Sequence, residues 1–173
     1  MLSVPLKPQA SGFTLIEMMV AVAIMGILAA VAFPSLQTML RNSEVRNAAE
    51  SVVNGLQRAR AEAVSRNTNV NLVFAVNSAW SVNVVNPAAV IESRSANEGS
   101  KNVTINVLPT GATTVTFNNF GGVVANADAS ASITQIDLAA PGSNQTLRVT
   151  IGVGGNARMC DPNLAPGSSP RAC

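Results

Sequence analysis

The stretch Gly12-Phe13-Thr14-Leu15-Ile16-Glu17, followed by an apolar run that ends at Phe33, decides how this chain is organised. From Phe13 to Phe33 there are 21 residues, and Glu17 is the only charged one. At about 1.5 Å per residue, a helix of this length reaches roughly 30 Å, the thickness of a bilayer core. The sequence therefore predicts a transmembrane helix over residues 13–33.

The segment before this run is short and polar, with Lys7 as its only charged side chain. An ordinary secretory signal has a shorter apolar region and is cut after it. Here the best small-residue boundary, Ser11-Gly12, precedes the apolar run. Cleavage at this boundary would remove residues 1–12 as a leader and leave the hydrophobic helix on the mature protein.

Glu17 needs a partner or a function, because a carboxylate in hydrocarbon costs roughly 3 kcal/mol. If the chain is cut between Gly12 and Phe13, the new α-amine lies four residues before Glu17, which is one helical turn. The two charges then pair within one chain, or Glu17 pairs with the Phe13 amine of a neighbouring subunit and sets the register of packing. The simpler alternative is an interfacial glutamate whose carboxylate reaches the headgroups.

These residues resemble the processing site of type IV pilins and of type II secretion pseudopilins. The resemblance implies that a prepilin peptidase cuts after Gly12, that the new N-terminal Phe13 is methylated and that Glu17 guides assembly. It also places the family's helix-breaking proline at Pro34. The expected location is the bacterial inner membrane, with a single-pass helix, a periplasmic C-terminal domain and later incorporation into a pilus.

Beyond Pro34 the pattern predicts an amphipathic helix over residues 34–66. Pro34 is expected to kink or locally open the helix, because it lacks an N–H and clashes with the preceding turn. Gly55 weakens the helix. Apolar residues recur at spacings of four and three, on one face that is ready to pack on a sheet: Val45, Ala49, Val52, Leu56, Ala59 and Ala63.

The other face of this predicted helix is charged, with five Arg and three Glu between residues 41 and 66. Arg46 with Glu50, and Arg58 with Glu62, have the spacing of ion pairs one turn apart. The arginines are candidates for contacts with neighbouring subunits or anionic lipid. A solvated helix face is the simpler interpretation.

After residue 66 the period of the pattern changes to two, which predicts a C-terminal β domain over residues 67–173. Six strands are expected, with Asn77-Ser78 as the turn of a first hairpin. The predicted fold class is α+β, a long N-terminal helix packed on an antiparallel β-sheet. The apolar positions of the six strands are Val70, Leu72 and Phe74; Trp80, Val82 and Val84; Val103, Ile105 and Val107; Val115 and Phe117; Ile133, Ile136 and Leu138; and Leu147, Val149, Ile151 and Val153.

Two motifs of this domain resemble the FimT/FimU and GspH branch of minor pilins: Val115-Thr116-Phe117-Asn118-Asn119-Phe120-Gly121, and Leu147-Arg148-Val149-Thr150-Ile151 before Gly155. The resemblance implies a minor pilin of the type IV pilus that primes pilus assembly and serves twitching motility, adhesion or DNA uptake. Its implied partners are other minor and major pilins, the prepilin peptidase and the inner membrane. The alternatives are a GspH-like pseudopilin in the tip of a type II secretion pseudopilus and a DNA-binding pilus-tip subunit for natural transformation.

The DNA alternative depends on the C-terminal arginines. Gly155-Asn156-Ala157-Arg158 resembles the Gly-Arg-x-Arg ending through which some FimT proteins are implicated in DNA uptake, but Asn156 replaces the first Arg. The candidate DNA-binding residues are Arg148, Arg158 and Arg171, with ordinary surface arginines as the simpler explanation. After residue 66 the chain has five Lys and Arg against five Asp and Glu, whereas a DNA-binding domain usually carries a basic excess.

Cys160 and Cys173 are the only cysteines and predict a disulfide formed in an oxidising compartment. The chain has no His, which excludes Ser-His-Asp and Cys-His catalysis and histidine metal ligands. Accordingly, no enzymatic activity, cofactor or metal is expected. Trp80 is more simply a core residue than a stacking platform, and residues 126–130 lack the distal Glu of a calcium loop.

Overall fold

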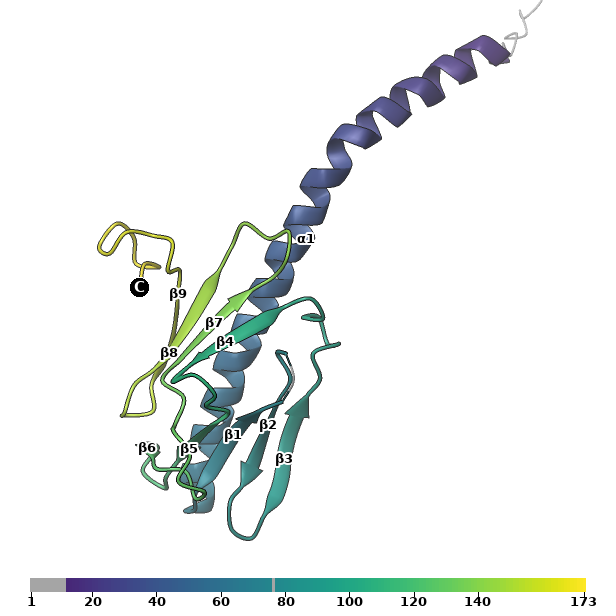
Figure 1. Cartoon of the computed structure of the whole chain (residues 1–173). Helices are drawn as coiled ribbons and strands as arrows, with labels where there is room; N and C mark the ends of the chain where they lie inside the picture. The colour runs from purple at the N-terminus through teal and green to yellow at the C-terminus, as the bar shows by residue number, and fades with distance from the viewer. Residues whose placement is uncertain (1–11, 76) are drawn as a thin grey trace, which may run out of the picture. The chain divides into compact units, whose positions relative to one another are not determined.

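A computed structural model describes residues 12–75 and 77–173 of the chain (Figure 1). The predicted leader, residues 1–12, therefore lies outside the described residues except for Gly12. The chain divides into two compact units, Met1–Gln37 and Thr38–Cys173.

One long helix, α1 (Leu15–Arg66), contains both of the helical segments that the sequence predicts. It begins two residues after the predicted start, because Thr14 caps it. The Thr14 Oγ1 atom accepts a hydrogen bond from the Glu17 N–H at 3.3 Å, and the Thr14 carbonyl accepts one from Met18 at 3.2 Å. The pattern Thr-x-x-Glu is the signal of such a cap, and here it is formed by residues 14–17, within the Gly12–Glu17 stretch.

The predicted break at Pro34 does not end the helix, since α1 continues through that residue. A proline removes one N–H donor, and one lost bond does not end a helix of 52 residues. The predicted kink at Pro34 stays a prediction. The predicted end is correct. Asn67 adopts the left-handed conformation, with φ at 51°, and the Thr68 N–H bonds back to the Ala63 carbonyl at 3.2 Å.

The predicted apolar stripe of α1 is buried at all six positions. Ala48, Ser51 and Gly55 widen it. A Cβ atom on Gly55 would lie 3.0 Å from a Leu72 methyl group and 3.1 Å from the Trp80 ring. The glycine that weakens the helix thus lets the helix and the sheet approach closely.

The β domain contains two antiparallel sheets, whereas the sequence predicts one (Figure 1). The first sheet has the order β3-β2-β1-β5-β6 and the second the order β4-β7-β8-β9. The strands of the described residues are β1 (Val70–Phe74), β2 (Trp80–Val84), β3 (Ala89–Arg94), β4 (Thr104–Leu108), β5 (Thr114–Phe117), β6 (Val123–Val124), β7 (Gln135–Ala139), β8 (Leu147–Ile151) and β9 (Ala157–Cys160). All six predicted strands are present, and β1 and β2 form the predicted hairpin.

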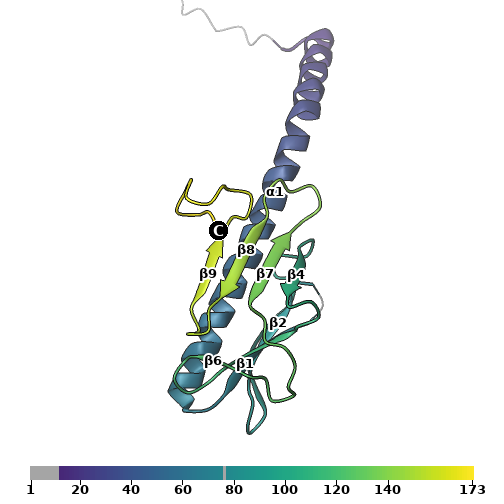
Figure 2. The same cartoon turned by 60° about the vertical axis from the view of Figure 1, so that its left-hand side comes forward.

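The sequence pattern does not predict three of the strands, and the reason is the same for each. The strands β3, β6 and β9 lie at sheet edges, and their residues are mostly exposed or half-buried. A strand with little buried surface needs no alternation of apolar and polar residues. The central strands β1, β2, β7 and β8 do alternate, and their inward residues join the buried face of α1 in one core. Figure 2 shows strands β7 and β8 alongside the second half of α1.

Candidate assembly and binding sites

The large apolar side chains of α1 up to Leu36 are exposed over at least half of their surface, from 51 % at Val20 to 78 % at Leu15. By length and composition, α1 is the one helix of the described residues that is able to cross a membrane. The exposed side chains point around the whole circumference of this half of the helix, as a lipid-facing or helix-facing segment requires.

Glu17 lies in the first turn of α1, is exposed and makes no ion pair with any described residue. Phe13 precedes the helix in this uncleaved chain. The predicted pairing of Glu17 with the Phe13 amine therefore has no counterpart here, because the amine is formed only by cleavage. The roles of Gly12 and Phe13 in processing stay predictions.

The charged side of α1 beyond Gln37 is organised around Glu62. The Glu62 carboxylate accepts a hydrogen bond from Arg66 Nε at 2.6 Å and pairs with Arg58 at 2.9 Å. The hydrogen bond from Arg66 and the charges of both arginines hold the pKa of Glu62 below its ordinary value. The predicted Arg58–Glu62 pair is confirmed, while Arg46 and Glu50 form no ion pair in the described part of the chain.

The predicted disulfide joins Cys160, the last residue of β9, to Cys173, and the Cα atoms lie 5.1 Å apart. Backbone bonds close the same loop, since the Asp161 N–H donates to the Arg171 carbonyl at 2.7 Å. Arg158 donates to the Ala172 carbonyl at 2.9 Å and to the Pro170 carbonyl at 3.3 Å. The tail after β9 is thus folded back and fixed beside the second sheet.

The three candidate DNA-binding arginines gather near this tail, but two of them are engaged inside the protein. Arg148 forms a two-pronged ion pair with Asp137, at 2.7 and 3.0 Å, and the hydrogen bonds that it donates to the Asp137 carboxylate raise the arginine's pKa. Arg158 holds the tail carbonyls. Arg171 forms no ion pair among the described residues, and it lines a small pocket with Arg46 and Asp161.

The two motifs that carry the family resemblance meet in space. A Cβ atom on Gly155, whose φ is 77°, would collide with the Gly121 carbonyl oxygen, and that oxygen accepts a hydrogen bond from Arg60 Nε at 3.0 Å. The Val123 N–H donates to the Val153 carbonyl at 2.9 Å. Two turns, residues 118–122 and 152–156, are thereby locked to each other and to α1.

These locked turns present the two most exposed large apolar side chains of the β domain. Phe120 is 84 % exposed and Val153 is 89 % exposed. A groove beside Phe120 is lined by α1 residues Gln57, Arg60, Ala61, Val64 and Ser65. Rigid backbone with exposed apolar side chains is typical of a protein–protein contact surface. We call Phe120 and Val153 the turn patch.

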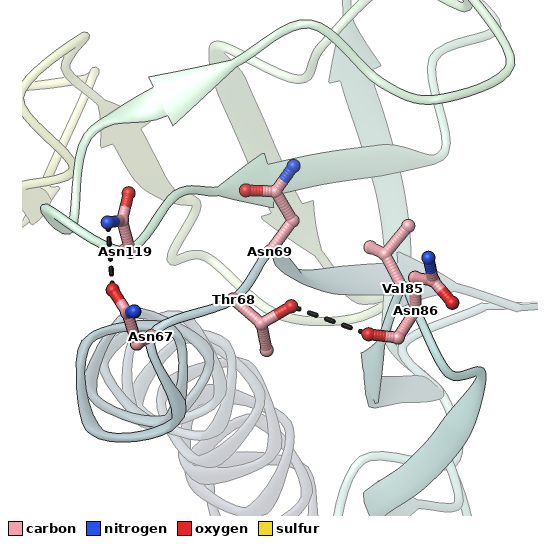
Figure 3. Close-up of a pocket in the computed structure, with 6 residues that line it drawn as sticks. All are labelled: Asn67, Thr68, Asn69, Val85, Asn86 and Asn119. Atoms are coloured by element: carbon pink, nitrogen blue, oxygen red, sulfur yellow. Dashed lines mark hydrogen bonds between the residues drawn. The ribbon is translucent and has the colours of Figure 1, made fainter.

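A polar pocket of about 400 Å³ lies where α1 ends (Figure 3). It is lined by Asn67, Thr68, Asn69, Val85, Asn86 and Asn119. Figure 3 shows two hydrogen bonds within it, from Asn119 Nδ2 to Asn67 Oδ1 at 2.9 Å and from Thr68 Oγ1 to the Asn86 carbonyl at 3.5 Å. No sequence motif marked these residues, which come from three separate segments.

Two further candidates have structural roles. Trp80 is 5 % exposed, and its Nε1 donates to Ser51 Oγ at 2.9 Å, so it is a core residue. Asn126 is buried, and its amide donates to the Ser130 and Ala131 carbonyls. Hydrogen bonds from Ser130 lower the pKa of Asp128. Within residues 12–75 and 77–173, no group of three or more Asp, Glu, His or Cys residues is placed to hold a metal.

Solved structures share this fold. The type IV minor pilin FimU of Pseudomonas aeruginosa aligns with a TM-score of 0.53 and 20 % sequence identity over 71 % of this chain and 98 % of FimU. The minor pseudopilin EpsH of the Vibrio cholerae Type 2 Secretion System aligns with a TM-score of 0.53 and 14 % identity over 70 % of this chain and 99 % of EpsH. At these identities the similarity establishes the fold, a long helix on antiparallel sheets.

The sequence also matches two family models. Residues 7–33 match the prokaryotic N-terminal methylation motif. Residues 48–155, well over half of the chain, match the type II transport protein GspH. The chain therefore belongs to the GspH family of pilin-like subunits. The minor pilin FimU and the minor pseudopilin EpsH are similar to it in fold.

Proposed function

We propose that this chain is a minor pilin of the type IV pilus, of the FimT/FimU type, which primes pilus assembly from the inner membrane. The observation that carries the proposal is the exposed apolar half of α1 with Glu17 as its only charge. Such a segment is stable in a bilayer or among the same segments of other pilins. In this proposal, assembly moves the apolar segment from the bilayer into contact with the apolar segments of other pilins.

In this proposal, the prepilin peptidase cuts after Gly12 and methylates Phe13. The new cationic amine of a neighbouring subunit neutralises Glu17, which removes the cost of a lone carboxylate in an apolar bundle and fixes the axial register. The β domain lies in the periplasm. The turn patch of Phe120 and Val153 supplies a contact for a neighbouring pilin at the level of the β domains.

Replacement of Glu17 tests the proposal. Glu17→Ala is expected to leave processing intact and to reduce the number of surface pili in a strain that carries it as the sole copy. Glu50→Ala is the matched control, because Glu50 is an exposed residue of the same helix without an ion pair in the described chain. Gly12→Trp is expected to leave the leader on, seen as a slower band on a gel. Normal pilus number with Glu17→Ala and normal processing with Gly12→Trp would sink the proposal.

The second candidate is a pseudopilin of type II secretion, because EpsH matches this chain as well as FimU does by TM-score and coverage. A deletion strain separates the two candidates. The pilus proposal expects lost twitching with intact protein secretion. Lost secretion with intact twitching would reverse the order of the candidates.

DNA capture at a pilus tip is a weaker candidate, because Arg148 is neutralised by Asp137 and Arg158 holds the tail. It predicts salt-dependent binding in a gel shift that is lost when Arg158 and Arg171 are changed together. Arg171→Ala alone is the more informative variant, because it leaves the Arg158 contacts to the tail in place. No shift at low salt would exclude this function.

A further inference from the structure

We propose that the polar pocket at the end of α1, lined by Asn67, Thr68, Asn69, Val85, Asn86 and Asn119, binds a neutral sugar unit. We call it the amide pocket. The inference does not depend on the proposed role in pilus assembly.

The walls of the amide pocket are fixed by contacts between segments far apart in the sequence. Asn67 stands in the left-handed conformation directly after α1 and is held by Asn119 from the turn after β5. The Val85 N–H donates to the Asn69 carbonyl at 3.0 Å, and Thr68 bonds to the Asn86 carbonyl. The pocket therefore has a defined shape before any ligand arrives, which lowers the entropic cost of binding.

Hydrogen-bonding groups in the amide pocket remain available. The side-chain amides of Asn69 and Asn86 make no hydrogen bond to any described residue, and only one polar atom of Asn67 and of Asn119 is used in their mutual bond. A side-chain amide offers two donors and a carbonyl oxygen with two lone pairs. Sugar hydroxyls both donate and accept, so they match this mixture of donors and acceptors.

The absence of charged residues in the pocket makes an ionic ligand unfavourable. None of its six lining residues is charged. The nearest arginine in sequence, Arg66, is bound to Glu62. The lining offers no counter-charge to a phosphate or a carboxylate, so a neutral ligand is favoured.

The pairing of the surrounding strands makes an extended peptide an unfavourable ligand. Peptides add to free strand edges, but β1 is paired on both sides by β2 and β5, and β2 is paired by β1 and β3. A volume of about 400 Å³ falls in the range of small-molecule sites. Val85 adds one apolar side chain that suits the C–H face of a sugar ring.

Side-chain amide signals of the uniformly ¹⁵N-labelled full chain test the proposal directly. The protein is kept in phosphocholine micelles, because many common detergents carry sugar headgroups that would compete. Methyl β-glucoside, methyl β-galactoside and N-acetylglucosamine are added separately. At least one is expected to shift the amide signals of Asn67, Asn69, Asn86 and Asn119 together and with saturation.

Variants separate a specific site from general surface effects. Asn69→Ala and Asn86→Ala are each expected to weaken binding about 2- to 10-fold, as the loss of one hydrogen bond does. Asn106→Ala is the matched control and is expected to change nothing, because Asn106 is exposed on the edge strand β4. Unchanged thermal unfolding of each variant shows that the fold is kept.

Three results would overturn the proposal. The first is no saturable shift with any of the three sugars up to about 50 mM, beyond the weak end of useful affinities. The second is an equal loss of binding in Asn106→Ala. The third is a saturable shift with an uncharged peptide, N-acetyl-trialanine amide, and none with sugars, which would assign the pocket to a polypeptide partner.

Discussion

The two halves of α1 are both rich in apolar residues, yet the surroundings of these residues differ. Up to Leu36 the large apolar side chains are exposed all around the helix. From Val45 to Ala63 most of the apolar residues form one stripe, and the β domain buries the stripe residues Val45, Ala49, Val52, Leu56, Ala59 and Ala63. The presence of apolar residues does not distinguish the two halves of the helix. The spacing of those residues does. A bilayer surrounds a helix on every side, whereas a sheet covers only one side of it.

The comparison also explains the placement of charge. The first half carries Glu17 alone, which makes no ion pair with any described residue. The second half carries its charges on the uncovered side, where Glu62 is paired by Arg58 and Arg66 within the same helix. The proposed assembly would supply a partner for Glu17, whereas Glu62 already has two partners in its own helix.

The largest effect is expected from truncating the covered stripe. Leu56→Ala removes a side chain that is 1 % exposed and should cost about 2–5 kcal/mol of β-domain stability. Leu28→Ala removes the same atoms from a side chain that is 65 % exposed and should change that stability by less than about 0.5 kcal/mol. Urea unfolding followed by Trp80 fluorescence measures both. Equal losses would mean that the halves do not differ as described.

A charge in the uncovered half should act on the membrane and leave the fold intact. Ile24→Arg is expected to reduce insertion by roughly 3 kcal/mol and to move protein from the membrane fraction to the soluble or degraded fraction. Gln57→Arg, on the exposed side of the covered half, serves as the control and should fractionate as the unchanged protein does. Full membrane retention of Ile24→Arg would argue against a bilayer-spanning role for this half.

A substitution at Gly155 tests whether close packing holds the turns 118–122 and 152–156 against each other and against the second half of α1. Gly155→Ala combines a left-handed backbone with a collision at the Gly121 carbonyl, and should cost about 3 kcal/mol. Gly167→Ala has a similar φ of 81° but open space around the added methyl group, and should cost only about 1 kcal/mol. Thermal unfolding distinguishes the two, and equal melting temperatures would disprove the steric lock.

The smallest effect is expected from removing a charge in the second half of α1. Because folding lowers the pKa of Glu62, its contribution to stability is present above the ordinary value of 4.5 and is lost as the pH falls below it. Glu62→Gln should therefore cost about 0.5 kcal/mol at pH 7 and progressively less as the pH falls through the lowered pKa of the folded state. Urea unfolding of both proteins at pH 7 and pH 3 gives the difference. A gap that is as large at pH 3 as at pH 7 would assign the effect to packing.

Local signals in the sequence were sufficient for much of the fold. The six buried positions of α1, the end of the helix near residue 66, the β1–β2 hairpin and the Cys160–Cys173 bond were all predictable. Each rests on a period, a turn or a pair of residues that acts over a short range. The capping role of Thr14 was equally readable and was missed.

The sites were less predictable. The three C-terminal arginines do gather near the tail, but only the register of β8 with β7 shows that Asp137 neutralises Arg148. The turn patch depends on two turns that lie 34 residues apart in sequence, 118–122 and 152–156. The amide pocket has no motif, because its residues are unremarkable until three segments bring them together.

The sequence by itself determined the class of the protein: an apolar helix whose single charge is Glu17, followed by a β domain with a disulfide-closed tail. Only the tertiary structure decided that there are two sheets, which arginines are already paired and where exposed apolar or amide groups converge. The reason is physical. Hydrophobic periodicity is set by the element that a residue belongs to, whereas pairing and convergence are set by contacts between elements, and the chain order does not specify those contacts.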